Sequence, residues 1–178
     1  LNKLNDPDIR AIVLHYFDIT EQKASDARRD SNRKFLEDVS AVLSGSLDYR
    51  TTVDKVVSLA LGYLGDWCSL DLFVEDGSIE QVAMAHNNAD LLSRIQESKL
   101  RPAVLSQEPP FSTAIATGEV LYVNGLEDCS YLAAPLKARG HVLGVLSLVK
   151  ECKSDQDDGQ DIVFIKEVAT RVALHIDN

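Results

Sequence analysis

The chain has 178 residues, of which 45% are hydrophobic, and its formal net charge is -10 at pH 7. This length and apolar content support one folded domain with additional elements and exclude a wholly disordered chain. The negative charge disfavours unassisted binding to nucleic acid or to a membrane surface, because phosphate backbones and lipid headgroups are anionic. The apolar runs are far shorter than the ~20 residues that a membrane-spanning helix needs, so we predict no membrane insertion.

The N-terminus and the cysteines indicate the context of the chain. The sequence begins without Met and lacks the basic and apolar regions of a signal peptide, so we expect a segment from inside a longer protein. Three widely spaced cysteines, Cys68, Cys129 and Cys152, suit thiols in a reducing compartment better than a disulfide framework. A cytoplasmic location is therefore expected.

Two elements are predicted in the first part of the chain. Residues 10–17 form a β-branched and aromatic run of strand length, and Asp18 or Thr20 is a suitable N-cap for a following helix. Residues 21–47 contain no Pro and carry amphipathic spacing, which predicts a long helix. One strand cannot bury a hydrophobic face alone, so we expect residues 1–20 to be disordered or paired with another surface.

A helix and a hairpin are predicted next. Apolar residues recur at helical spacing over 51–64, and Gly65 is a natural stop. Residues 67–75 then alternate with period two, with one face wholly apolar and the other mixed. Asp76-Gly77 is a hairpin turn signal, so the strand over 78–86 should return antiparallel to the first.

The second half of the chain begins with an irregular insertion. It contains a short predicted helix at 89–97, a helical turn from Ser112 that Gly118 closes, and a strand at 119–123. A long, loop-rich insertion inside a compact domain is usually functional. Two further strands follow, at 131–137 and 141–150, and the turn Arg139-Gly140 joins them. A C-terminal helix comes last, and its apolar stripe consists of Ile162, Ile165, Ala169, Val172 and Ile176.

Four segments, in this order of elements, resemble a known family. They are Phe35-Leu-Glu-Asp-Val-Ser-Ala-Val-Leu-Ser, Asp66-Trp-Cys-Ser-Leu-Asp-Leu, Leu132-Ala-Ala-Pro-Leu-Lys-Ala-Arg-Gly-His-Val-Leu-Gly-Val-Leu and Ala173-Leu-His-Ile-Asp-Asn. The chain from residue 35 onward resembles a GAF domain. The resemblance implies an α+β fold with a central antiparallel sheet of five or six strands. The N- and C-terminal helices would cover one face, and a loop-rich ligand-pocket side would form the other.

A second resemblance adds the domain order. Residues 10–23, with a strand and then Asp18-Ile-Thr-Glu-Gln-Lys, resemble the end of a PAS domain. The chain then divides into a truncated PAS end at 1–20, a signalling helix at 21–47 and a GAF domain at 48–178.

Together the resemblances imply a sensory or regulatory input module of a bacterial two-component signalling protein, of the sensor histidine kinase type. Such a module binds a small molecule, forms a homodimer through its terminal helices, or does both, and passes a conformational signal to an output domain. Its expected partners are a second copy and the adjacent PAS and output domains, and this fragment is not expected to be an enzyme. A structural dimerisation spacer without ligand is the main alternative. A thiol redox enzyme and a bilin or haem sensor are less favoured.

The mixed face of the first hairpin is the candidate ligand site. Apolar walls with a few polar groups are typical of small-molecule pockets, but simple packing against the insertion would produce the same pattern. We predict no cofactor and no metal, and the small molecule stays unidentified. The candidate ligand-binding residues are Ser69, Asp71, Phe73, Met84, His86, Phe111, Thr113 and Tyr122. The candidate dimer-interface residues are Phe35, Val39, Val42, Ile165, Val172 and Ile176.

Three residues suggest more specific chemistry, but their surroundings do not support it. His175 lacks the sequence box of a phosphoacceptor histidine, and Cys129 is not followed by the His found in bilin-binding GAF domains. His86 has no second ligand at metal-binding spacing, so an iron site is disfavoured. Structural roles are favoured for all three.

Overall fold

The computed structural model describes residues 20–45, 48–87, 111–126, 129–151 and 158–177. The chain divides into two compact units, Leu1–Arg33 and Lys34–Asn178. The predicted strand at 10–17 and the predicted helix at 89–97 lie outside the described residues. Among the helices that are described, none combines the length and the apolar character needed to cross a bilayer.

The elements form one antiparallel sheet and several helices. The strand order is β2-β1-β5-β4-β3, and every neighbouring pair is antiparallel. The predicted α+β class and the antiparallel sheet are therefore confirmed. In chain order the elements are α1 (Thr20–Ser44), α2 (Tyr49–Leu64), β1 (Trp67–Phe73), β2 (Ile79–His86), α5 (Phe111–Thr117), β3 (Leu121–Leu126), β4 (Cys129–Ala138), β5 (His141–Glu151) and α6 (Asp158–Ile176).

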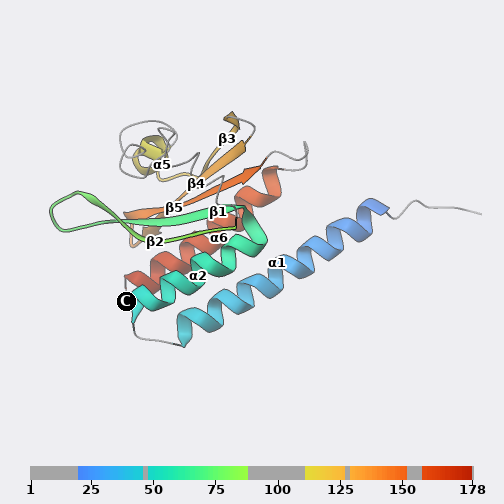
Figure 1. Ribbon diagram of the computed structural model, residues 1–178, viewed down its shortest axis with the longest axis horizontal. Coiled ribbons are helices and arrows are strands. Elements are labelled where there is room, and N and C mark those ends of the chain that lie inside the picture. Colours follow the sequence, from blue (N-terminus) through green and yellow to red (C-terminus); the bar gives the residue numbers. More distant parts are fainter. Residues whose placement is uncertain (1–19, 46–47, 88–110, 127–128, 152–157, 178) are drawn as a thin grey trace, which may run out of the picture. The chain divides into compact units, whose positions relative to one another are not determined.

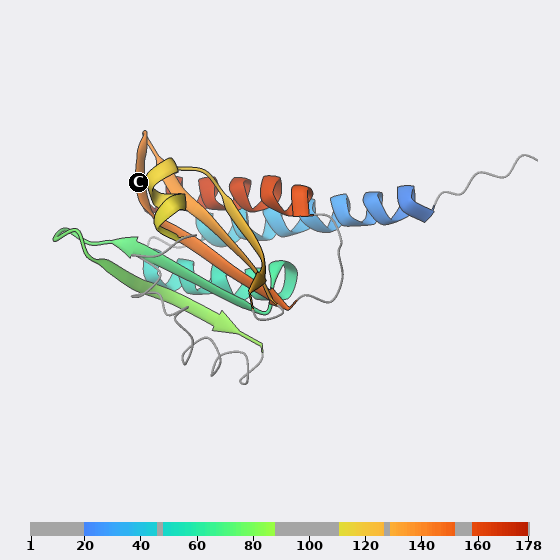
Figure 2. The same cartoon turned by 90° about the horizontal axis from the view of Figure 1, so that it is seen from above.

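Helices cover one face of the sheet in the unit that begins at Lys34. There α2, α6 and the second half of α1 lie on one side, and the short helix α5 lies on the other (Figure 1). Phe35 of α1 joins the three helices, since its ring centroid is 4.8 Å from that of Tyr63 on α2 and 5.5 Å from that of Phe164 on α6. The view from above shows the strands crossing over the helices (Figure 2).

The period-two pattern of β1 decides which side chains face the helices. Cys68, Leu70 and Leu72 belong to the helix-side core, whereas Trp67 belongs to the core on the opposite face. The neighbouring strand β5 repeats this division, with Leu146 and Leu148 toward the helices. Both central strands are therefore buried on both faces.

The two hairpin turns follow the chemistry predicted from the sequence. Gly77 has a positive φ of 81°, and the Asp76 carboxylate accepts a hydrogen bond of 2.8 Å from the Ser78 amide. In the second turn both Arg139 and Gly140 have positive φ, at 46° and 86°. Two consecutive positive φ values are the requirement of a type I′ turn, which matches the twist of the strands that it joins.

The residues proposed for the dimer interface lie in the core of one chain instead. Phe35, Val39, Ile165 and Val172 are each 0% exposed. Val42 and Ile176 are partly buried and pack against the same core. The four fully buried side chains are not available to a surface between chains, because α1, α2 and α6 use them to pack against one another and the sheet. A homodimer stays a prediction, and it would need other residues.

Gly144 should be essential to the pairing of the two central strands. A Cβ at this position would lie 2.1 Å from the backbone oxygen of Asp71 and 2.9 Å from Leu72 Cα. We expect Gly144→Ala to lower the free energy of unfolding by about 3 kcal/mol or more, because backbone must move to relieve the overlap. Urea denaturation followed by circular dichroism measures this loss. Gly140→Ala is the control: nothing lies within 4 Å there, so only the positive φ is penalised, by about 1 kcal/mol.

Charged substitutions at Val39 and Val172 should unfold the domain rather than separate two chains. Each would bury an unpaired carboxylate, which costs several kcal/mol, so we expect Val39→Asp and Val172→Asp to lose more than about 3 kcal/mol. Leu174→Asp is the matched control on α6, since Leu174 is 50% exposed and should change stability by less than about 1 kcal/mol. A folded monomer of Val172→Asp, obtained from a wild-type dimer in size-exclusion chromatography, would contradict this expectation.

Candidate functional site

A group of buried polar side chains crosses the sheet on the face opposite the three helices. We call Ser69, Asp71, Tyr131 and Ser147 the polar ladder. The Ser69 hydroxyl donates to Asp71 Oδ2 at 2.9 Å, and the hydroxyls of Tyr131 and Ser147 are hydrogen-bonded at 2.9 Å. Ser69 and Ser147 are paired across β1 and β5. All four residues are at most 1% exposed, so the ladder lies under the residues that cover this face.

An apolar layer surrounds the ladder. Helix α5 contributes Phe111 and Ala114, which are both 0% exposed. Gly118 ends this helix, with a φ of 66° and an amide that donates to Ala114 O at 2.9 Å. The buried apolar residues of this layer are Trp67, Phe111, Ala114, Cys129, Tyr131, Ala133, Val145 and Val149.

Three polar atoms in this region are buried without a hydrogen-bond partner among the described residues. They are Asp71 Oδ1, Trp67 Nε1 and His86 Nδ1. Trp67 and His86 are paired across β1 and β2, and Trp67 and Asp71 are on the same face of β1. A buried polar group without a partner costs about 1–3 kcal/mol. Three such atoms on one face are typical of a site whose partners come from elsewhere.

Burial also changes the acidity of the ladder. It raises the pKa of Asp71 from its ordinary value of 3.8 to about 7, although the hydrogen bond from Ser69 opposes the shift. Burial likewise raises the pKa of Tyr131, and the negative charge of Asp71 adds to that increase. Tyr131 therefore keeps its proton at neutral pH, whereas Asp71 can take either state.

Most of the predicted site residues lie on the ladder face. Ser69 and Asp71 belong to the ladder, and Phe111 belongs to the apolar layer. Phe73 follows the same alternation at the end of β1 and is half-buried, as is Thr113 on α5. The structure therefore brings these five residues to one side of the sheet.

The two predicted residues of β2 lie at the edge of the same face. Met84 is paired with Ser69, and His86 is paired with Trp67. Met84 is 41% exposed, while His86 is half-buried. Directly paired residues point to the same side of a sheet, so both side chains are at the border of the ladder face.

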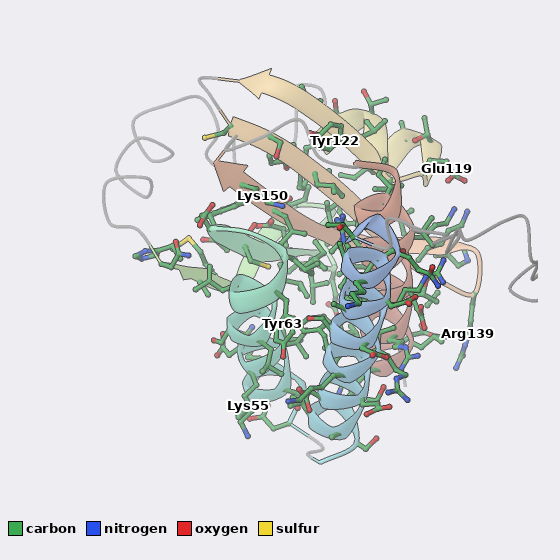
Figure 3. The ribbon with its side chains drawn as sticks, turned by 90° about the vertical axis from the view of Figure 1, so that its right-hand side faces the viewer. Lys55, Tyr63, Glu119, Tyr122, Arg139 and Lys150 are labelled. Atoms are coloured by element: carbon green, nitrogen blue, oxygen red, sulfur yellow. The ribbon has the colours of Figure 1, made fainter. Side chains whose placement is uncertain are left out.

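Tyr122 does not join this group. It is paired with Leu132, and both residues pack in the helix-side core. Figure 3 labels Tyr122 on β3. The prediction that Tyr122 faces the insertion is wrong, because the register of β3 places Leu121 on the ladder face instead.

Sequence reasoning missed three residues of the site: Trp67, Tyr131 and Ser147. Trp67 has the same parity as Ser69 and Asp71, so the alternation of β1 already contained it. Ser147 was detectable as one hydroxyl between Val145 and Val149 in an otherwise apolar strand. Tyr131 required the pairing of β4 with β5, which no local pattern provides.

Among the described residues, the cysteines and the possible metal-binding side chains form no evident reactive centre. Cys68 and Cys129 are buried on opposite faces of the sheet. Burial raises the pKa of Cys68, and the nearby Asp71 charge raises it further, so this thiol stays protonated and unreactive. Within the described ranges, no three His, Cys, Asp or Glu side chains are grouped as metal ligands would be.

The fold and the comparisons define the class of the protein. The sequence profile of the GAF domain family matches residues 48–176. The chain therefore belongs to the GAF domain family, whose members are regulatory and sensory modules found in histidine kinases and other signalling proteins. No curated protein matches the chain significantly.

Solved structures show the same fold. The GAF domain of a predicted sensor histidine kinase from Pseudomonas syringae pv. tomato has 21% identity and a TM-score of 0.62, over 90% of this chain and 95% of that chain. The A. aeolicus nlh2 GAF domain in an inactive state has 13% identity and a TM-score of 0.64, over 84% and 98%. A free methionine-R-sulfoxide reductase from Neisseria meningitidis, with its substrate bound, has 16% identity and a TM-score of 0.62, over 95% and 96%.

Asp71 should make the stability of the domain fall as pH rises. Its pKa is about 7 in the folded chain and near 3.8 when unfolded, so between these values only the folded state holds the proton. The contribution of Asp71 to the free energy of unfolding is therefore lost from about pH 4 to pH 7 and does not change further above that range. Asp71→Asn cannot titrate and should be more stable than the wild type at pH 8 by about 1.4 kcal/mol for each unit of the shift.

Urea denaturation of both proteins at pH 5 and pH 8 measures this difference. The other acidic groups titrate in both proteins, so comparing the two pH dependences isolates Asp71. Equal pH dependence of wild type and Asp71→Asn would show that the carboxyl has an ordinary pKa.

Proposed function

We propose that this chain is a sensory input module that binds a small molecule over the polar ladder and passes the resulting change to its last helix. The observation that carries the proposal is the set of buried, unpartnered polar atoms on the ladder face: Asp71 Oδ1, Trp67 Nε1 and His86 Nδ1. A ligand that pairs with them removes a cost of about 1–3 kcal/mol for each atom. Binding would therefore stabilise the arrangement of strands that holds these atoms together.

The contact between α1 and α6 supports a relay role. Arg171 of α6 donates to the backbone oxygen of Leu36 at 3.3 Å and also to the Ser40 hydroxyl on α1. Its other nitrogen bonds Glu167 at 2.7 Å, which fixes the guanidinium. Because Phe35 contacts Phe164 and Ser40 contacts Arg171, the two helices run parallel. A shift of one can thus pass directly to the other.

Two ion pairs connect α6 to the end of α5 and to the β4–β5 turn. Glu119, just after α5, is 3.0 Å from Lys166, and Arg139, in the β4–β5 turn, is 2.8 Å from Asp177. Figure 3 labels Glu119 beside α5 and Arg139 nearer the level of the helices. Exposed pairs of this kind contribute about 0–1 kcal/mol each, so they bias the position of α6 without locking it. A change at α5 or in the turn therefore has a direct contact through which to act.

We also propose a parent protein and a domain order for this module. We place the module in a bacterial two-component protein of the histidine kinase type, in the cytoplasm, between a PAS domain that ends near residue 20 and an output domain. The resemblance of residues 10–23 to a PAS end and the likeness to the Pseudomonas syringae GAF domain support this placement. The module forms a homodimer and performs no catalysis itself. A structural spacer without ligand is the second candidate.

A ligand screen tests the proposal against the spacer. We expect at least one compound, in a thermal-shift screen of nucleotides, amino acids, haem and bilins, to raise the melting temperature, because a ligand that prefers the folded state stabilises it. Phe111→Ala, in the apolar layer, should weaken the affinity for that compound about tenfold or more and so reduce the rise in melting temperature. Leu174→Ala on the exposed side of α6 is the control and should leave it unchanged. A screen without any hit would support the spacer.

A further inference from the structure

We propose that the polar ladder binds an organic cation: an ammonium or amidinium group on a flat, apolar body, with its nitrogen donating to Asp71. This inference rests on the proposed function, since it requires the ladder face to be a ligand site. It adds the chemical class of the ligand.

The Asp71 carboxylate is buried and only partly hydrogen-bonded. Asp71 is 1% exposed, and its Oδ2 accepts one hydrogen bond, from Ser69. Oδ1 has no partner in the part of the chain that the structure describes. Each carboxylate oxygen can accept about two hydrogen bonds, and a buried charge is stable only when it is paired. Asp71 can therefore accept a further hydrogen bond, from a donor that is also a counter-ion.

The described residues nearest to Asp71 on this face carry little charge. Helix α5, with the sequence FSTAIAT, has no ionisable side chain, and β5 has none between Val145 and Val149. Across β2, the residue paired with Asp71 is the neutral Gln81. Among the described residues, the other ionisable groups of this face are Cys129 and Tyr131 of β4, His86 of β2, and Lys137 and Glu119 beside the end of α5. His86 is paired with Trp67 at the other end of β1.

Three positively charged side chains of the described segments lie near other groups, and no pairing of them with Asp71 is seen. Lys166 and Arg139 form ion pairs with Glu119 and Asp177. Lys137 Nζ lies beside Gly118, 3.2 Å from where a Cβ would be. None of these three is seen paired with Asp71, so the ligand itself would supply the positive charge. An anionic ligand would instead place like charges together in a buried site.

The apolar layer around the ladder contains aromatic rings. Trp67 and Phe111 are at most 1% exposed, and they provide aromatic surface on the same face as Asp71. Aromatic rings attract cations through their negative faces and also pack against flat apolar groups. A face that carries both a buried carboxylate and aromatic rings thus suits a cation on an aromatic or alicyclic body better than a strongly hydrated metal ion.

Two matched series of probes test the inference. The first is benzamidine, benzamide and benzoate, and the second is phenethylamine, 2-phenylethanol and phenylacetate; in each, shape is similar and charge runs from positive to negative. Titration calorimetry at pH 7.5 with millimolar probe should show at least tenfold tighter binding of the cation than of its neutral and anionic counterparts. Asp71→Asn should lose at least tenfold in affinity for the cation. Asp54→Asn, the same change at an exposed position of α2, should bind as the wild type does.

A spectroscopic measurement adds a readout that a structural role would not move. The side-chain carboxyl ¹³C shift of Asp71 should report an ionised carboxylate at pH 6 when benzamidine is bound, and a largely protonated group without it. No change on saturation with benzamidine would overturn the inference.

The outcomes separate this inference from the proposed function. Equal or tighter binding of the neutral or anionic probes, or retained affinity in Asp71→Asn, overturns the cation and leaves the ligand site intact. Absence of binding by all six probes also overturns the cation, while the broader screen decides the function. Arg94, Lys99 and Arg101 lie in the sequence outside the described residues. If one of them already paired with Asp71, Asp71→Asn would be less stable than the wild type at pH 8, and the inference would fail.

Discussion

The antiparallel pairing of β1 with β5 is the constraint on which the rest of the structure depends. Both strands are buried on both faces, because each carries residues of the helix-side core on one face and residues of the opposite core on the other. Gly144 allows the two backbones to approach, since any side chain there would meet Asp71 O. The same pairing sets Ser69 opposite Ser147. One register therefore produces both the core and the polar ladder.

The polar ladder lowers the stability of that core locally. A central strand buried on both sides is most stable when it is wholly apolar, as parallel sheets show. Asp71 departs from this rule, and its raised pKa measures the cost of burying a carboxylate. Folds usually retain such a cost where function requires it. A group that binds over Asp71 would turn this local instability into binding energy, which is how a sensor gains a response.

The sequence predicts well whatever has a local period or a turn requirement. The alternation of β1, the positive-φ turns at Gly77 and Gly140, and the helix α2 all follow from short-range patterns and are found in the structure. The predictions that failed concern which other element or chain a side chain packs against. A stripe such as Ile165 and Val172 fits another helix of the same chain as well as one of a second chain, so the pattern alone could not choose. Tyr122 failed because pairing with β4, rather than its own strand, fixes its face.

The direction of the two terminal helices bears on how such a module could transmit a signal. Because α1 and α6 run parallel and contact each other at Phe35–Phe164 and Ser40–Arg171, displacement along or around α1 meets α6 without crossing the sheet. The ladder face is on the far side of the sheet, and the end of α5 and the β4–β5 turn contact α6 through Glu119 and Arg139. In the proposed role the last helix would receive two inputs, one from the preceding helix and one from the ladder face. Packed helices have discrete arrangements rather than a continuous range, so a ligand and an upstream domain would bias the same choice.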